Sequence, residues 1–126
     1  MHRVLLREIV IDAPPDQFDA VAKFWAGLLD TEARQIADYP EFTALPDPAA
    51  LSTVGLQRIH EGAARYHVDV ETDDVEAEVA RLIRLGATER NRHRSWVVLE
   101  DPAGLLLCVV PVATDEFDDR SRVVDG

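Results

Sequence analysis

Residues 64–74, "ARYHVDVETDD", place one histidine in a run where polar and apolar residues alternate. Successive side chains of a strand point to opposite faces, so one face of this predicted strand carries only ionisable groups. These groups are Arg65, His67, Asp69 and Glu71. Such a face is either exposed to water or lines a cavity in which the imidazole can take part in chemistry. A single strand histidine beside aspartates is also commonly a hydrogen-bonded structural residue, so both interpretations stay open.

Composition limits the partners that this chain can have. The 126 residues predict one domain, and the hydrophobic fraction of 47% is typical of a globular protein. The 24 acidic and 13 basic residues give a net charge of −11, which disfavours nucleic acid and anionic membrane surfaces. A cationic or neutral small molecule is easier to accommodate, although net charge mainly reports solubility.

Other features of the sequence predict a cytoplasmic protein. No apolar run approaches the roughly 20 residues of a membrane helix. The N-terminal "MHRVLLREIVIDAPP" has too short an apolar stretch for a signal peptide. The single cysteine, Cys108, excludes an internal disulfide and a zinc site built from several cysteines.

The elements that must position His67 occur in a pattern that the chain repeats. Each pass predicts a strand, a helix and three further strands. The first pass consists of a strand at 4–12, a helix at 16–30 and strands at 33–37, 41–45 and 52–59. The second consists of a strand at 65–71, a helix at 73–87 and strands at 88–91, 95–100 and 105–112. An aspartate caps the second helix and Gly86 ends it, and "DPAG" at 101–104 forms the turn before the last strand.

A single βαβββ unit leaves one face of its sheet uncovered, so we expect the two units to pair. This predicts an α+β fold with two βαβββ modules, spanning 4–60 and 64–111, in one domain over 1–112. Glu8 and His67 occupy matching places in the first strands of the two modules, as do Gln57 and Cys108 in the last strands. Residues 113–126 are acidic and aperiodic, which predicts a mobile or loosely docked tail.

Several segments resemble one superfamily of proteins. They are "REIVIDAPP", "FWAGLLD", "LQRI", "RYHVDVETDDVEAEVARLIRLGA" and "VLEDPAGLLLCVV", which together cover about residues 4 to 111. In these segments the chain resembles the glyoxalase / bleomycin-resistance / extradiol-dioxygenase (vicinal oxygen chelate) superfamily, and within it the small glyoxalase-like domains. The resemblance implies a curved mixed sheet that forms a cup between the two modules.

The resemblance also implies a site. In the superfamily's enzymes, one residue from the first and last strands of each module points into the cup, and together they hold a divalent metal. These positions fall on Glu8, Gln57, His67 and Cys108. Cys108 stands where the metal enzymes normally have glutamate, so the implied ligands are Glu8, Gln57 and His67, with Cys108 lining the cup. Such a donor set suits Zn²⁺, Ni²⁺, Mn²⁺ or Mg²⁺. His67 is then expected to point into the cup, while Val68 and Val70 pack under the helices.

Three functions follow as alternatives. The first is a glyoxalase-like small-molecule binding protein or a lyase- or isomerase-type enzyme, in which a metal chelates two adjacent substrate oxygens. The second is a metal-free binder, resembling bleomycin-resistance proteins, that sequesters a cationic or aromatic compound without turnover. The third is a structural or partner-binding module. Trp96 and Trp25 are candidates to line the cup, although core packing explains each of them as well. Similar proteins are frequently homodimers, which implies the same here.

Overall fold

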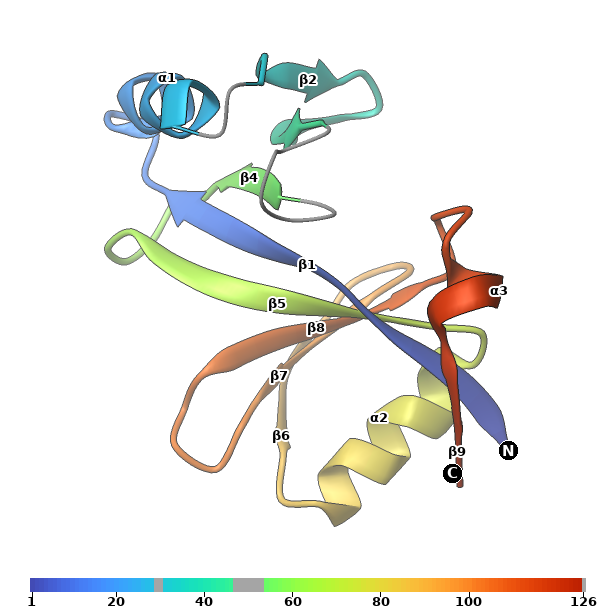
Figure 1. Cartoon of the computed structure of the whole chain (residues 1–126). Helices are drawn as coiled ribbons and strands as arrows, with labels where there is room; N and C mark the ends of the chain where they lie inside the picture. Colours follow the sequence, from blue (N-terminus) through green and yellow to red (C-terminus); the bar gives the residue numbers. More distant parts are fainter. Residues whose placement is uncertain (29–30, 47–53, 126) are drawn as a thin grey trace. The chain divides into compact units, whose positions relative to one another are not determined.

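The computed structural model describes residues 1–28, 31–46 and 54–125 (Figure 1). Its elements alternate in the order that the repeated pattern predicts, with a short helix and strand added at the end. In order they are β1 His2–Ala13, α1 Phe18–Leu28, β2 Arg34–Ile36, β3 Tyr39–Leu45, β4 Val54–Arg58, β5 Arg65–Thr72, α2 Val75–Arg84, β6 Thr88–Arg92, β7 Val97–Glu100, β8 Leu106–Pro111, α3 Phe117–Arg120 and β9 Arg122–Val124. The predicted end of the first helix, Leu29-Asp30, and most of the "PDPAA" break lie outside the described residues.

Contacts divide the chain into two compact units. Unit 2 is the continuous segment Glu8–His67, and unit 1 combines Met1–Arg7 with Val68–Gly126. The boundaries fall inside β1 and β5, so each of these strands contributes one part to each unit.

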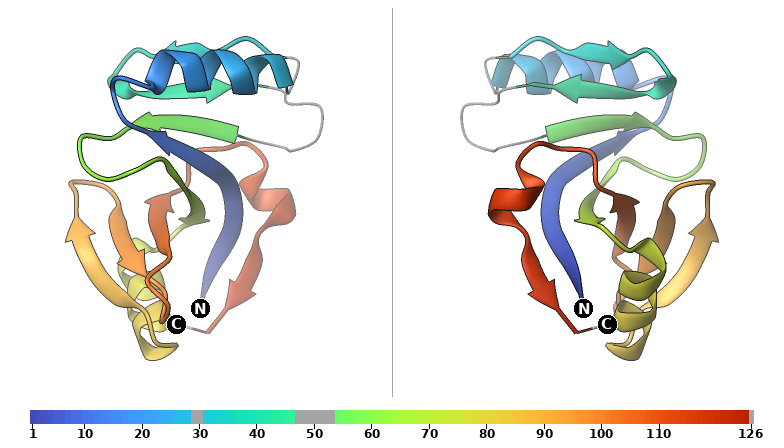
Figure 2. Two further views of the ribbon diagram at one scale, coloured as in Figure 1. Left: turned by 90° about the vertical axis from the view of Figure 1, so that its left-hand side faces the viewer. Right: turned by 90° about the vertical axis from the view of Figure 1, so that its right-hand side faces the viewer.

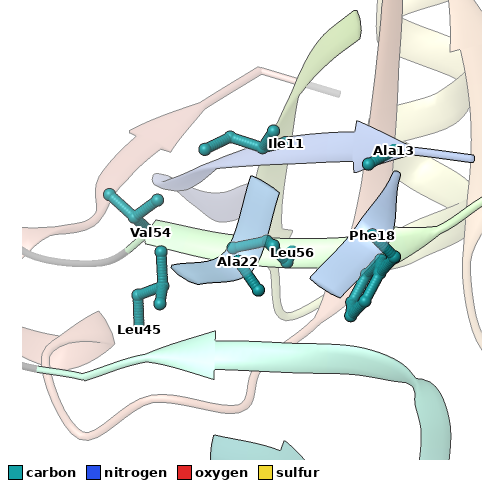
Figure 3. Packing of buried hydrophobic residues seen from close by; sticks show 7 residues of the cluster. All are labelled: Ile11, Ala13, Phe18, Ala22, Leu45, Val54 and Leu56. Atoms are coloured by element: carbon teal, nitrogen blue, oxygen red, sulfur yellow. The ribbon is translucent and has the colours of Figure 1, made fainter. Parts of the chain in front are cut away.

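Unit 2 is the first βαβββ module. β1 runs parallel to β4, β3 is antiparallel to β4, and β2 is antiparallel to β3. α1 lies across the sheet formed by β2, β3 and β4 (Figure 2). Phe18 and Ala22 of α1 face the sheet because they recur at helical spacing. The resulting core consists of Ile11, Ala13, Phe18, Ala22, Leu45, Val54 and Leu56 (Figure 3).

Unit 1 repeats this connectivity. β5 runs parallel to β8, β7 is antiparallel to β8, and β6 is antiparallel to β7. Val79 of α2 packs against a cluster from the sheet that consists of Val97, Leu99 and Val109. Val70 pairs with Val109 in the register of β5 and β8, so Val68 and Val70 lie on the face that α2 covers, as predicted. The α+β fold of two βαβββ modules is confirmed.

The sequence features that predict the two ends of α2 have the expected roles in the structure. The Asp74 side chain accepts a hydrogen bond from the Ala77 backbone N–H at 3.0 Å, which satisfies a donor at the start of the helix. Gly86 follows the last turn at φ 117°, a conformation that favours glycine. In the "DPAG" turn, Asp101 Oδ1 accepts hydrogen bonds from the backbone N–H groups of Ala103 and Leu105, each at 2.8 Å.

The C-terminal segment differs from the loosely docked tail that its composition predicts. β9 pairs antiparallel with the first residues of β1, and Phe117 of α3 is 1% exposed. The Arg3 guanidinium lies over the Phe117 ring, 4.7 Å from its centroid, and Arg3 pairs with Asp118 at 2.7 Å. A three-residue strand and a four-residue helix are too short to produce a recognisable period, so the sequence pattern does not reveal them.

No helix among residues 1–28, 31–46 and 54–125 is long and apolar enough to cross a membrane.

Candidate functional site

Strand β5 buries its polar face. His67 and Asp69 are 7% and 8% exposed and Glu71 is 0% exposed, whereas Tyr66 on the other face is 61% exposed. From His67 to Glu71 this face therefore does not meet bulk water, whereas the Arg65 side chain at its start is 38% exposed. Burying such groups costs free energy unless they are paired or hydrogen-bonded, so their partners decide what this face can do.

The partner of His67 within unit 2 is Asp12 of β1. Nδ1 of His67 lies 2.7 Å from Oδ2 of Asp12, and both side chains are buried. The Nε of Arg65 lies 3.7 Å from the same carboxylate oxygen. The other oxygen of Asp12, Oδ1, is buried without a hydrogen-bond partner among the described residues. Oδ2 of Asp12 is thus close to both His67 and Arg65, while Oδ1 could still accept a hydrogen bond.

Glu8 and Gln57 lie on the same face of the unit 2 sheet as Asp12. Asp12 pairs directly with Gln57 in the register of β1 and β4, and Ile11 on the opposite face belongs to the core under α1. The Glu8 carboxylate lies against Gly55: a Cβ added to Gly55 would be 2.9 Å from Oε2 of Glu8. The absent side chain of Gly55 therefore leaves the room that the Glu8 carboxylate occupies.

Sequence analysis did not single out Asp12. Asp12 is four positions after Glu8 in one strand, so alternation places both on the same face. This shared face was the only indication in the sequence that Asp12 could belong to the site. It did not establish that role, because an aspartate followed by "APP" is also typical of the turn that ends a strand.

In unit 1, Glu71 is the most buried of the β5 carboxylates, and it is fully engaged. Thr114 donates to Oε1 of Glu71 from its backbone N–H at 3.1 Å and from its hydroxyl at 3.0 Å. The Nε of Arg7 lies 3.6 Å from Oε2. These contacts fasten the start of the C-terminal segment to the face of β5 that points away from α2.

Asp69 pairs with Cys108 in the register of β5 and β8, and both are buried. Both residues belong to unit 1, whereas His67 is the last residue of unit 2. Sequence analysis named His67 and Cys108 as site residues and did not name Asp69 as a candidate.

The predicted aromatic positions have separate outcomes. Trp96 is half-buried and stacks on His93, with ring centroids 4.5 Å apart and an interplanar angle of 18°. The side chain of Trp25 lies outside the described residues. Whether either tryptophan lines a cup stays a prediction.

A second buried carboxylate of unit 1 lies in α2. Burial raises the pKa of Glu78, but hydrogen bonds from Arg81 and His2 outweigh burial and bring that pKa below its usual range. The Nε2 of His2 lies 3.1 Å from Oε1 of Glu78, and the Nη2 of Arg81 lies 2.9 Å from Oε2. This network joins β1 to α2 and has no link to the polar face of β5 in the contacts described here.

The family model for the glyoxalase-like domain matches residues 8–110, which is most of the chain. The chain belongs to the glyoxalase-like domain family. The resemblance predicted from the sequence is confirmed, and Glu8, Gln57, His67 and Cys108 all fall within the matched range. α3 and β9 lie beyond this range.

Solved structures show the same fold. The methylmalonyl-CoA epimerase of Mycobacterium tuberculosis is 15% identical, covers 86% of this chain and 88% of its own, and gives a TM-score of 0.55. A variant of the Streptomyces coelicolor methylmalonyl-CoA epimerase, in complex with 2-nitronate-propionyl-CoA, is 17% identical over 86% of this chain and 97% of its own, with a TM-score of 0.55.

A third neighbour is described as an NAD-dependent benzaldehyde dehydrogenase from Legionella pneumophila. It is 14% identical, covers 83% of this chain and 99% of its own, and gives a TM-score of 0.58. No curated protein matches the chain. At these identities the neighbours establish the glyoxalase-like fold and leave the chemistry to the site itself.

Proposed function

We propose that this glyoxalase-like protein binds a small carbonyl compound and a divalent cation, and catalyses a lyase- or isomerase-type reaction. Glu8, Gln57 and His67 would hold the cation. The observation that carries the proposal is the buried polar face of unit 2, where Asp12 and His67 are hydrogen-bonded at 2.7 Å and Asp12 Oδ1 has no hydrogen-bond partner among the described residues. A buried acceptor without a donor requires an explanation, and a bound ion or ligand is one.

The donor set of unit 2 fits a divalent cation. It offers a carboxylate from Glu8, an amide oxygen from Gln57 and an imidazole from His67, all of which are ordinary ligands of such ions. The strand register places Glu8 and Gln57 on one face, and Gly55 leaves room for the Glu8 carboxylate. These observations support the ligand assignment that the family resemblance implies.

A bound divalent cation would polarise the substrate carbonyl and so make the neighbouring proton easier to remove. The protein contributes a buried surface on which Asp12 and His67 are shielded from water, so electrostatic interactions there are stronger than in solution. Two neighbours are methylmalonyl-CoA epimerases, and they support the class of reaction proposed here. We extend only that class to this protein and leave the substrate's identity open.

Cys108 favours a second candidate function. The resemblance places a charged ligand at this position, and a buried cysteine beside Asp69 behaves as a small apolar residue instead. A metal-free protein that sequesters a cationic or aromatic compound would need no fourth ligand. A homodimer in the cytoplasm is part of both proposals, and size-exclusion chromatography with light scattering tests the dimer.

Metal content and thermal shifts distinguish the two candidates. If the protein is a metal enzyme, untagged protein should contain one divalent ion per chain, or its melting temperature should rise when Zn²⁺, Ni²⁺, Mn²⁺ or Mg²⁺ is added. The rise is expected because a ligand that binds only the native state stabilises it. Glu8→Gln and His67→Gln should each abolish most of this gain. Glu32→Gln removes an exposed carboxylate of the same unit and serves as the matched control.

The outcomes are distinct. A metal-dependent shift that Glu8→Gln and His67→Gln abolish, and Glu32→Gln keeps, supports the metal enzyme. Protein that no metal stabilises, but that cationic or aromatic compounds do, supports the binder. A metal shift that survives both ligand variants would show that the cation binds elsewhere and would refute the ligand assignment.

A further inference from the structure

Asp12 was not among the residues that the family resemblance implies, yet it is the closest described contact of the His67 ring. Its Oδ2 lies 2.7 Å from Nδ1 of His67, and the two side chains are 2% and 6% exposed. We propose that Asp12 is a positioning residue that fixes the ring of His67 with its Nδ1–H directed at the carboxylate. Nε2 of His67 would then carry the lone pair that the proposed site uses, so this inference rests on the proposed function.

The tautomer follows from hydrogen-bond chemistry. An ionised carboxylate only accepts hydrogen bonds, so the nitrogen that faces Asp12 at 2.7 Å must carry the proton. A neutral imidazole has one N–H and one lone pair, so a proton on Nδ1 leaves the lone pair on Nε2. Such carboxylate–histidine pairs are the usual means by which proteins fix the orientation and basicity of a metal-binding or proton-accepting imidazole.

Arg65 provides a positive charge beside the same carboxylate oxygen. Its Nε lies 3.7 Å from Oδ2 of Asp12, the oxygen that His67 contacts. Oδ2 is therefore approached both by an arginine and by Nδ1 of His67, and the shorter contact fixes which nitrogen of the His67 ring faces Asp12.

The second carboxylate oxygen of Asp12, Oδ1, supports the inference that Asp12 orients the His67 ring rather than mainly stabilising the fold. Oδ1 is buried and receives no hydrogen bond from the described residues, so the carboxylate is under-satisfied. Asparagine has the same shape, but its amide presents either a donor or an acceptor to Nδ1. If the amide N–H faces the ring, His67 must become the Nε2–H tautomer and lose the lone pair at the proposed site.

NMR spectra of the metal-free protein test the inference directly. Long-range ¹H–¹⁵N correlations of histidine-labelled protein distinguish the Nδ1–H tautomer, the Nε2–H tautomer and the imidazolium by their nitrogen shifts. The His67 signal is identified by its absence in His67→Gln. We expect the Nδ1–H pattern for His67 in the parent protein, and a substantial Nε2–H population in Asp12→Asn. Asp38→Asn, which removes an exposed carboxylate of the same unit, should leave the pattern unchanged.

A second measurement separates this inference from the proposed function. By calorimetry, Asp12→Asn should weaken divalent metal binding about tenfold to hundredfold, the usual effect of losing a carboxylate behind a ligating histidine. Parent protein with the Nδ1–H pattern but without metal affinity would overturn the metal proposal and leave the role of Asp12 intact. In spectra recorded at a pH where the imidazole is neutral, an Nε2–H pattern in the parent would overturn the role of Asp12, and this result needs no folded variant. An Asp12→Ala protein, which has no acceptor at this place, would also overturn it if it kept only the Nδ1–H pattern, because another group would then set the tautomer.

Discussion

Deletion of residues 113–126 should destabilise the protein strongly, in contrast to what their composition predicts. The deletion removes Phe117, which is 1% exposed, and the two donors that Thr114 supplies to the fully buried Glu71. Loss of a buried phenylalanine side chain costs about 3–5 kcal/mol. A buried carboxylate left without its donors costs about 1–3 kcal/mol more. We expect a total loss of at least about 4 kcal/mol, before the hydrogen bonds between β9 and β1 are counted.

Thermal and urea unfolding measure this effect. For a chain of this length, 1 kcal/mol corresponds to roughly 3–5 °C, so the melting temperature should fall by more than about 10 °C. Phe117→Ala should account for most of that loss. Val123→Ala in β9 is the matched control because its side chain is 61% exposed, and its effect should stay within about 0.5 kcal/mol.

A shift below about 2 °C for both the deletion and Phe117→Ala would refute the docking of this segment. It would support instead the division into a domain over 1–112 and an independent tail. A large loss on deletion with no loss for Phe117→Ala would place the stabilisation in Thr114 and Glu71, and Thr114→Val would then show it.

Three further perturbations test other parts of the structure. Gly55→Ala places a methyl group against the carboxylate of Glu8, so it should weaken metal binding about tenfold by calorimetry while changing the melting temperature little. Glu78→Gln should destabilise the protein at pH 7 and progressively less as pH falls below 4.5, because a carboxylate with a lowered pKa stabilises the fold only while it is ionised. Cys108→Glu should raise metal affinity at least tenfold, about 1.4 kcal/mol. Without metal it should lower the melting temperature, because it adds a carboxylate beside Asp69; unchanged affinity would refute the role given to this position.

The sequence predicts the modules well because their signals are local and repeated. Alternation in β5, the Asp74 cap and Gly86 each report on a few neighbouring residues, and each has the predicted role. The C-terminal segment is different, since its order depends on contacts with Arg3 and Glu71, distant in sequence. The acidic composition of the segment does not indicate that one of its side chains, Phe117, is buried.

The site was only partly predictable for a related reason. Parity places Glu8 and Asp12 on one face of β1, but only tertiary structure shows that the imidazole of His67 meets Asp12. Sequence reasoning preferred Glu8 because the family resemblance implies a ligand there, and no pattern distinguishes a ligand from the residue that orients it. Asp69 was passed over similarly, since its register with Cys108 depends on how β5 and β8 pair.

The burial pattern of β5 explains why this face is better understood as a site than as a core. Replacing two buried polar partners by apolar side chains of similar size is often neutral or stabilising, so stability alone does not account for Asp12 and His67 where unit 2 could have apolar residues. In unit 1, Glu71 has donors from Thr114 and a cation in Arg7, and a structural role is enough to explain it. In the described part of the chain Oδ1 of Asp12 has no hydrogen-bond partner, and Arg65 and His67 both approach Oδ2. The two buried carboxylates therefore differ in their partners. This difference is why we assign Asp12 to orienting the imidazole of His67 and Glu71 to holding the C-terminal segment against β5.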